Sequence, residues 1–476
     1  MENKLEFEAI VVGAGPNGLA AAITIAREGH SVLLIEAKDT IGGGCRSAEL
    51  TLPGFIHDPC ATIHSLGVTS PFFRSLPLAD FGLEWIYPSA ALAHPLDNGR
   101  AVMLERSVEA TSEQMGRDAL AYRRMMSPFV ENWRKLSYEI LGPLRIPRYP
   151  FIMARFGWYA LRSARGLADR LFKEDRARAF FAGLAGHSIQ SLEKLPTAAF
   201  GLVLGASGHA AGWPVARGGS QKIVDALAKY FLSLGGKIVT SQAIGDIDEL
   251  PPAKVVLFDV SPRQLLGIAG KRLPEGYSRQ LRKFRYGPGV FKLDYALEGP
   301  IPWRAAECAR ATTVHLGGTL EEIVEAEEQV WNGGHPKEPF VLLAQQTTID
   351  PSRAPEGKHT VWAYCHVPNG STFDMKERIE AQIERFAPGF CDRILASTVT
   401  TPLELEQYNA NYIGGDINSG VQDLKQLFTR PVARLVPYST PVKGIYICSS
   451  STPPGGGVHG MSGYHAAKAA MRDLGG

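Results

Sequence analysis

Three glycines near the amino-terminus have the spacing of a dinucleotide-binding turn. Gly13, Gly15 and Gly18 form the pattern GxGxxG, which follows the apolar run 9–12 and opens the helical pattern 19–29. In this context the first glycine permits a tight turn, the second lets the backbone approach a pyrophosphate, and the third lets the helix lie close to the strand. The helix amino-terminus then offers free N–H groups and the positive end of its dipole to the phosphates. The pattern therefore predicts a dinucleotide site.

A carboxylate follows the next apolar run, where a ribose would be held. Residues 31–35 predict a second strand, and Glu36 comes directly after it. Its carboxylate is placed to accept hydrogen bonds from the adenosine ribose hydroxyls. A second cluster follows almost directly and consists of Gly42, Gly43, Gly44 and Arg46. A dinucleotide stretched toward a buried isoalloxazine needs such a close-approach loop and a cation near its phosphates, so the cluster favours FAD over NAD.

The acid, the glycine pair and the arginine in this order resemble the flavin amine oxidase and phytoene desaturase superfamily. Two further stretches extend the resemblance. Gly218 and Gly219 open a helical pattern, and the resemblance places the later Ile244 at the adenine. Residues 444–467 resemble the carboxy-terminal flavin motif, in which a glycine-rich turn and a helix amino-terminus face the pyrimidine edge of the flavin. The residues assigned to the flavin there are Ser450, Gly456, Gly457, Val458 and His459.

Residues 286–297 and 452–460 are most similar to the phytoene desaturase-like branch of this superfamily, which includes proteins named for a pyridine nucleotide-disulfide oxidoreductase domain. The resemblance spans nearly the whole chain and is specific for FAD, but only weakly specific for substrate. It implies hydride transfer between flavin N5 and a carbon of a lipophilic substrate. The chain departs from the family pattern at 245–255, where a proline-bearing connector replaces a β-hairpin. It also has no CxxC pair, which argues against disulfide reduction.

The candidate catalytic residues are His57 and His64. They lie in the segment 54–65, which the resemblance places beside the flavin. Either histidine has the chemistry of a general acid or base, or it is a polar residue packed under the ring. His459 lies inside the flavin turn, where contact with the ring is a better interpretation than proton transfer. No cluster of residues has metal-ligand spacing, so no metal is predicted.

Two other functions stay open from the sequence. A flavin amine oxidase would need an aromatic cage for a cationic nitrogen, and the candidate members are Trp303, Trp362, Tyr412 and Tyr438. A third hypothesis is that FAD is structural and that the protein is an interaction or chaperone-like module.

The glycine-bearing segments together predict an α/β fold with two interleaved domains, similar to flavin amine oxidases. The first is a discontinuous Rossmann-type FAD domain over 1–75, 212–282 and 430–476. The second is a substrate domain over 76–211 and 283–429. Its first part is predicted to be mostly helical, and its second part a mixed sheet with one helix near 376–386.

Composition excludes several classes of protein. The 476 residues are 45% hydrophobic, which suits a globular protein. The formal net charge of +2 gives no overall positive potential that would attract nucleic acid. The six cysteines have no zinc or disulfide pattern, and no apolar run reaches the roughly 18 residues that a membrane span needs. The first residues lead into a strand without the apolar core of a signal peptide. We expect a cytoplasmic protein with a lipophilic small-molecule substrate.

One segment, 143–178, departs from the overall charge balance. It holds nine basic and three acidic residues, with aromatic residues between them. Arginines and aromatic rings on an amphipathic helix are typical of peripheral membrane contact. A solvated basic face over a buried aromatic stripe and a subunit interface are the alternatives. The sequence leaves these open and does not indicate the oligomeric state.

Overall fold

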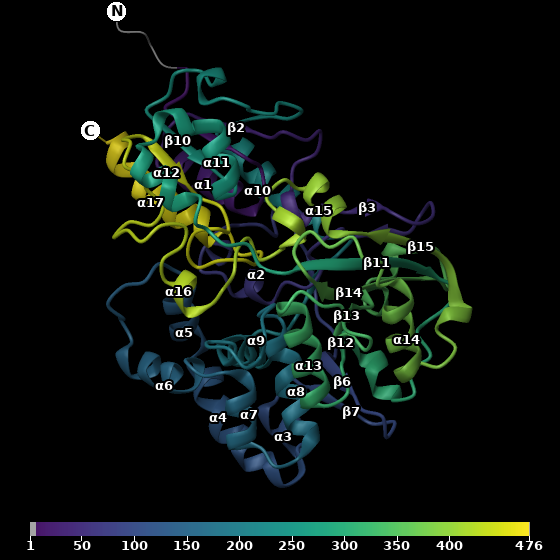
Figure 1. Ribbon diagram of the computed structural model, residues 1–476. Coiled ribbons are helices and arrows are strands. Elements are labelled where there is room, and N and C mark those ends of the chain that lie inside the picture. Colours follow the sequence, from purple (N-terminus) through teal and green to yellow (C-terminus); the bar gives the residue numbers. More distant parts are fainter. Residues whose placement is uncertain (1–5, 476) are drawn as a thin grey trace, which may run out of the picture.

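A computed structural model describes residues 6–475. A five-stranded parallel sheet, in the order β16-β10-β1-β2-β9, forms the upper part of Figure 1. Its strands are β1 (Ala9–Val12), β2 (Val32–Ile35), β9 (Lys237–Val239), β10 (Val255–Phe258) and β16 (Ile445–Ile447). Strands β1 and β2 are buried throughout, as expected for a parallel sheet covered on both faces. The strands come from all three segments predicted for the FAD domain.

Helices cover both faces of this sheet. One apolar cluster packs α1 (Pro16–Ala26), α10 (Gln221–Ser233) and α17 (Met461–Leu474) against it, and another packs α11 (Pro262–Ala269) and α12 (Glu275–Leu281). Helices α1 and α17 are in close contact at Gly463, where a Cβ would lie 1.8 Å from the Asn17 carbonyl oxygen. The first and last segments of the chain therefore build one body.

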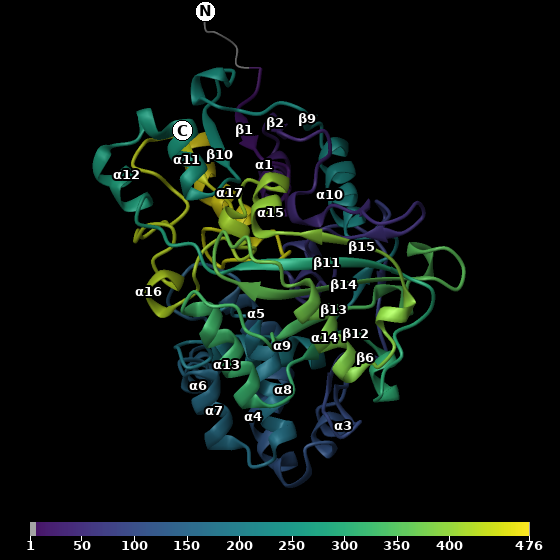
Figure 2. The same ribbon diagram turned by 45° about the vertical axis from the view of Figure 1, so that its right-hand side comes forward.

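A second, mixed sheet of seven strands lies beside the first (Figures 1 and 2), in the order β15-β11-β14-β13-β12-β6-β7. Only the β12–β6 pair is parallel. The strands are β6 (Ala90–Pro95), β7 (Ala101–Leu104), β11 (Gly289–Leu297), β12 (Ala311–Leu316), β13 (Val341–Ala344), β14 (His359–Val367) and β15 (Ile394–Thr400). Helices from 108–210 cover one of its faces.

These helices are α3 (Val108–Glu113), α4 (Ala119–Glu131), α5 (Trp133–Ile140), α6 (Pro150–Ala160), α7 (Ala164–Leu171), α8 (Asp175–Gly186) and α9 (Ala198–Ala210). The remaining helices are α2 (Ser65–Thr69), α13 (Leu320–Trp331), α14 (Lys376–Phe386), α15 (Pro402–Tyr408) and α16 (Leu424–Leu427). Two short strand pairs join β3 (Ala48–Glu49) to β4 (Ile56–His57) and β5 (Trp85–Ile86) to β8 (Val215–Ala216).

The mixed sheet and the helix at 376–386 are confirmed, but the prediction was incomplete in two places. Strands β5, β6 and β7 lie at the start of the insertion that was predicted to be mostly helical, and α13, α15 and α16 were not predicted. Strand β6 is alanine-rich, and its pairing with the distant β12 decides its conformation. None of the helices within residues 6–475 is long and apolar enough to cross a membrane.

Candidate functional site

A continuous cavity of about 1530 Å³ extends from the carboxyl end of the five-stranded sheet into the helical insertion. Ordinary ligand pockets measure about 300–1,000 Å³, so this space is larger than one such ligand needs. The predicted residues that line it are Gly13, Gly15, Glu36, Gly43, Gly44, Arg46, His64, Ile244, Ser450, Gly456, Gly457, Val458 and His459. Gly18, Gly42 and His57 are not among the lining residues.

The first glycine turn has the geometry expected of a close-approach site. Gly13 has a φ of +104°, a conformation that residues with a side chain rarely adopt. A Cβ on Gly18 would lie 1.8 Å from the Gly13 carbonyl oxygen, so Gly18 acts by packing α1 against β1. Helix α1 begins at Pro16, directly after Gly15, and its amino-terminus is at the cavity.

Asp259, at the end of β10, is a site residue that the sequence did not reveal. Its Oδ2 accepts a hydrogen bond from the Gly18 N–H at 2.9 Å and would lie 3.1 Å from a Cβ on Gly15. Burial raises the pKa of Asp259 to about 7, against the opposing effect of the Gly18 hydrogen bond. An acid whose pKa is near neutrality therefore lies at the turn predicted to bind phosphate.

Glu36 is held in place by the loop around it. One carboxylate oxygen accepts from the Ala14 N–H at 2.8 Å, and the other accepts from the Lys38 N–H at 3.0 Å and from Arg46 at 3.3 Å. The Arg46 Nε also donates to the Thr40 carbonyl oxygen. Arg46 thus orients the acid as well as lining the cavity. A carboxylate has about four acceptor sites, so it can still take a ribose hydroxyl.

We expect Glu36→Gln to lower the affinity for FAD about tenfold or more, because the amide turns an N–H₂ donor toward N–H groups that need an acceptor. Titration of the apoprotein with FAD, followed by flavin fluorescence, measures the change. Asp39→Asn is the matched control, because Asp39 is an exposed carboxylate outside the cavity lining. Equal affinities for Glu36→Gln and the unmodified protein would contradict the assignment.

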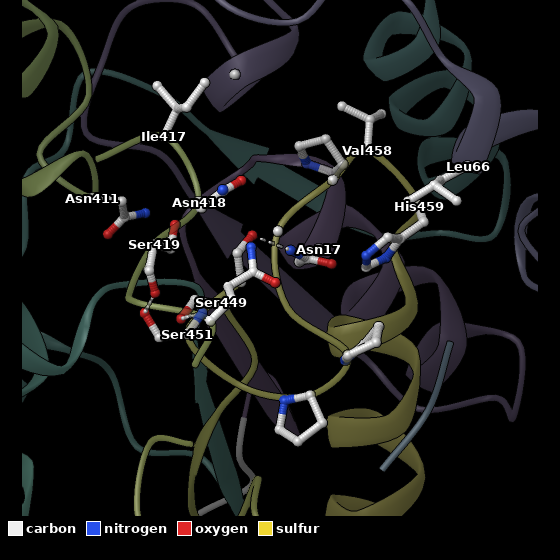
Figure 3. Close-up of a pocket in the computed structure, with 18 of the residues that line it drawn as sticks. Asn17, Leu66, Asn411, Ile417, Asn418, Ser419, Ser449, Ser451, Val458 and His459 are labelled. Carbon is white, nitrogen blue, oxygen red and sulfur yellow. Dashed lines mark hydrogen bonds between the residues drawn. The ribbon is translucent and has the colours of Figure 1, made fainter. Parts of the chain in front are cut away.

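Around the carboxy-terminal turn, polar atoms of neighbouring segments have no partner within the described residues. Figure 3 shows Asn17, Asn418 and His459 around this part of the cavity. Asn17 donates to Ser450 at 3.2 Å, while its Oδ1 and the Nδ2 of Asn418 are buried and unpartnered within residues 6–475. The Nδ1 of His459 accepts from the Met461 N–H at 3.0 Å, which leaves its Nε2 protonated. Buried polar groups need partners, and these acceptors and donors suit the polar edge of a flavin.

His64 reaches the cavity and His57 does not. The Ser220 Oγ donates to the Ala61 carbonyl oxygen at 2.5 Å, so the His64 Nε2, 2.8 Å from that Oγ, must donate to it. The His64 Nδ1 is then a free acceptor, and it is buried without a partner in the described chain. Burial lowers the pKa of His64 to about 4. At neutral pH His64 is therefore an uncharged hydrogen-bond acceptor.

The side chain of His57 contacts only other parts of the protein. Its Nε2 lies 2.8 Å from the Thr51 Oγ1, and its Nδ1 lies 3.5 Å from Asp294. The side chain is fully buried away from the lining of the cavity. Of the two candidate histidines, only His64 is placed to touch a bound molecule.

A buried ion cluster holds the segment that carries His64 against the glycine pair Gly218 and Gly219. Asp58 bonds Arg353 at 2.7 Å, the Ser47 hydroxyl at 2.5 Å and the Ser220 N–H at 2.9 Å. Arg353 also contacts Asp350, which accepts from the Gly218 N–H at 2.7 Å. Burial raises the pKa of Asp58, but Arg353 and the two serine hydrogen bonds outweigh it and hold the pKa below its usual value. No sequence pattern indicated this cluster, because Asp58, Ser220 and Arg353 are far apart in the chain.

Beyond His64 the cavity becomes an apolar chamber. Its walls come from 140–161, from α9 and from the mixed sheet, and they include Ile140, Met153, Phe156, Val203, Leu204, Leu342 and Tyr364. Of the four aromatic residues proposed for an amine cage, Trp362 and Tyr412 line the cavity. Trp303 bonds Gln345 and Tyr438 bonds the Pro453 carbonyl, and neither lines it. The chamber suits a lipophilic molecule.

The basic segment 143–178 borders the chamber. Leu144, Arg145 and Pro147 line the cavity, and the neighbouring Ile146 and Phe151 are 94% and 91% exposed. Acidic groups of other segments pair with arginines farther along the segment, since Arg165 bonds Glu193 and Arg178 bonds Glu321. In the apolar part, 144–162, Arg145 pairs with Glu139, while Arg148, Arg155 and Arg162 have no ion-pair partner within residues 6–475.

Comparison of the sequence with known proteins shows which proteins this chain is similar to. The family model described as an NAD(P)-binding Rossmann-like domain matches residues 11–76. The chain is 25% identical to pyridine nucleotide-disulfide oxidoreductase domain-containing protein 2 of Rattus norvegicus, over 99% of this chain and 94% of the relative. It is also 25% identical to a neurosporene-forming phytoene desaturase of Rhodobacter capsulatus, over 96% and 92%.

Solved structures agree in fold. An oxidoreductase from Methanosarcina mazei superposes with a TM-score of 0.67 at 16% identity, over 98% of this chain and 99% of that one. A putrescine oxidase bound to putrescine gives a TM-score of 0.62 at 17% identity, over 99% of both chains. The predicted fold class, a Rossmann-type domain with a mixed sheet as in flavin amine oxidases, is confirmed.

Proposed function

We propose that this protein, an FAD-dependent oxidoreductase homologous to the phytoene desaturases, transfers hydride between a carbon of a lipophilic substrate and the flavin. The homology confirms the predicted family resemblance, the enzyme class and the cofactor. The substrate class and the hydride step are the proposal.

One observation carries it: the cavity that begins at the dinucleotide-binding glycines continues without interruption into an apolar chamber. When bound, FAD supplies a flavin N5 that takes or gives a hydride. Glu36 and the glycine turns would hold its nucleotide half, and Asn17, Asn418 and His459 its polar ring edge. The apolar walls exclude water from the reacting carbon. His64, uncharged at neutral pH, offers an acceptor without placing a charge in the chamber.

The test is anaerobic reduction of the flavin in purified protein. Small molecules extracted from the protein are identified by mass spectrometry and added back, and the loss of visible flavin absorbance is followed. We expect a lipophilic compound to bleach the flavin. A protein that neither contains FAD nor gains thermal stability from added FAD would overturn the proposal. Bleaching by amines alone would select the amine oxidase, and a flavin that nothing reduces would select the structural role.

We also propose that residues 144–162 dock the protein on an anionic membrane surface, from which a lipophilic substrate enters. Three observations support this: the cavity reaches this segment, Ile146 and Phe151 are almost fully exposed, and basic residues surround them. Apolar side chains inserted at the headgroup level, with guanidinium groups nearby, are how peripheral helices bind anionic lipid.

Flotation with phosphatidylserine-containing vesicles tests the docking. The double variant Ile146→Asp/Phe151→Asp should remain in the soluble fraction, because each change removes an exposed apolar side chain that would enter the lipid and adds a negative charge that anionic lipid repels. Arg155→Glu/Arg162→Glu should weaken flotation more at low than at high salt. Leu395→Asp, on β15, is a control of similar type away from the segment. Undiminished flotation of both double variants would show that the segment does not bind the membrane.

A further inference from the structure

The face of the mixed sheet that turns toward the helices carries buried histidines. His315 on β12 is fully buried, and its pairing with Leu342, which in turn pairs with Tyr364, places it on the face that closes the chamber. His94 on the neighbouring strand β6 is equally buried. Helix α8 packs against β6, and both α8 and α9 pack against the next strand, β7 (Figure 2). A sheet face packed on helices normally carries apolar residues, so these side chains require an explanation.

His187 connects this polar group to the cavity. It follows α8 and lines the cavity, and its Nε2 lies 2.9 Å from the Nε2 of His315. Thr313, two residues before His315, also lines the cavity. Within residues 6–475 no group of three or more His, Cys, Asp or Glu side chains is arranged so that it could hold a metal ion. Burial lowers the pKa of His187 to about 3, and the ring is uncharged at neutral pH.

The hydrogen bonds indicate how the protons are distributed. His94 Nε2 lies 3.0 Å from the Gly318 carbonyl oxygen and must donate, so its Nδ1 is a bare acceptor. The Nδ1 atoms of His94 and His315 both lie 3.0 Å from where a Cβ on Gly183 would be. Neither Nδ1 has a hydrogen-bond partner within residues 6–475, so in the contact between the Nε2 atoms of His187 and His315 one ring donates and the other accepts. When the His187 Nε2 donates, the His187 Nδ1 is left as an acceptor for a molecule in the cavity.

Other polar groups here lack partners within the described chain. The Thr313 Oγ1, the Ser188 Oγ and both amide atoms of Gln190 are buried without a hydrogen bond, and Ile189 between the last two residues lines the cavity. Native proteins leave few buried polar groups unsatisfied, and each such group points to a water, a ligand or a function. Several of them beside one cavity indicate a ligand with a polar group.

We infer that His187 and Thr313 form a subsite for a hydroxyl group of the substrate, so that the substrate is a lipophilic alcohol rather than a hydrocarbon. A hydroxyl donates to the His187 Nδ1 and accepts from the Thr313 hydroxyl, which neither a hydrocarbon nor an ether can do in full. The inference rests on the proposed function in taking the apolar chamber as the substrate site. In this inference the polar end of the substrate lies against the mixed sheet.

Calorimetric titration of the FAD-loaded protein compares three ligands in detergent: farnesol, farnesyl methyl ether and the hydrocarbon of the same skeleton. We expect farnesol to bind at least about tenfold more tightly than the other two, because the polar groups of the subsite stay unpaired with them. His187→Phe should bind all three with similar affinity. His335→Phe, at a histidine bonded to Ser371 outside the cavity, should keep the preference.

Equal binding of the three ligands by the unmodified protein would overturn the inference, whether or not His187→Phe folds. A preference for farnesol that survives in His187→Phe would also overturn it. The proposed function fails in a different way, through absence of bound FAD or a flavin that no lipophilic compound reduces. Flavin absorbance recorded on each sample separates the two results.

Discussion

Replacing Arg353 with methionine is expected to lower the free energy of unfolding by about 3–5 kcal/mol, the cost of removing one partner from a buried ion pair. Arg353 and Asp58 are both fully buried, and their nitrogen and oxygen atoms lie 2.7 Å apart. Without the guanidinium, Asp58 and Asp350 would be left as neighbouring buried acids. Methionine fills part of the space but neutralises neither. Urea unfolding followed by circular dichroism measures the loss.

Two further variants separate charge from packing. In Arg353→Met/Asp58→Asn the buried charge of Asp58 is gone, so part of the stability should return. Arg217→Met breaks an ion pair with Glu84 in which both side chains are about half exposed, and it should change the unfolding midpoint little. The native pKa of Asp58 lies below its ordinary value, so its stabilising effect is present at neutral pH and lost on acidification. A loss in Arg353→Met no larger than in Arg217→Met would contradict the account.

Asp259→Asn is expected to stabilise the protein at neutral and alkaline pH by roughly 2–4 kcal/mol. The native pKa of Asp259 is raised to about 7 from an unfolded value near 4, chiefly by burial. The unfolded chain therefore loses its proton first, and the native state becomes less stable as the pH rises from about 4 to 7. Asparagine has no such proton, and its side-chain oxygen can still accept from the Gly18 N–H.

The pH dependence gives the check. The difference in unfolding free energy between Asp259→Asn and the unmodified apoprotein should grow from pH 5 to pH 7 and then level off. FAD affinity of the unmodified protein should fall over the same range, because an ionised carboxylate beside the glycine turn repels a pyrophosphate. The variant should show neither trend. A stability difference independent of pH would show that Asp259 does not titrate in this range.

The part of the predicted site that rests on residue types and spacing alone is local. The turn at 13–18 and Glu36 lie within one strand–helix–strand unit, so residue types and spacing suffice to place them. The later glycine segments were placed by family resemblance, and most of their residues line the cavity. His57 and His64 were indistinguishable in the sequence, because a strand pairing, β3 with β4, holds the first away from the cavity lining.

The sequence by itself determined the α/β class and FAD and predicted the place of the dinucleotide, since these follow from hydrogen-bonding groups and glycine conformations set within a few residues of each other. Only the tertiary structure decided the rest. His64 meets Ser220 across 156 residues, Arg353 meets Asp58 across 295, and His187 meets His315 across 128. Residues so far apart in the chain form no repeat and no fixed spacing that could be recognised in the sequence. Burial then sets the pKa of Asp259 and His64, and burial is a property of the packed chain.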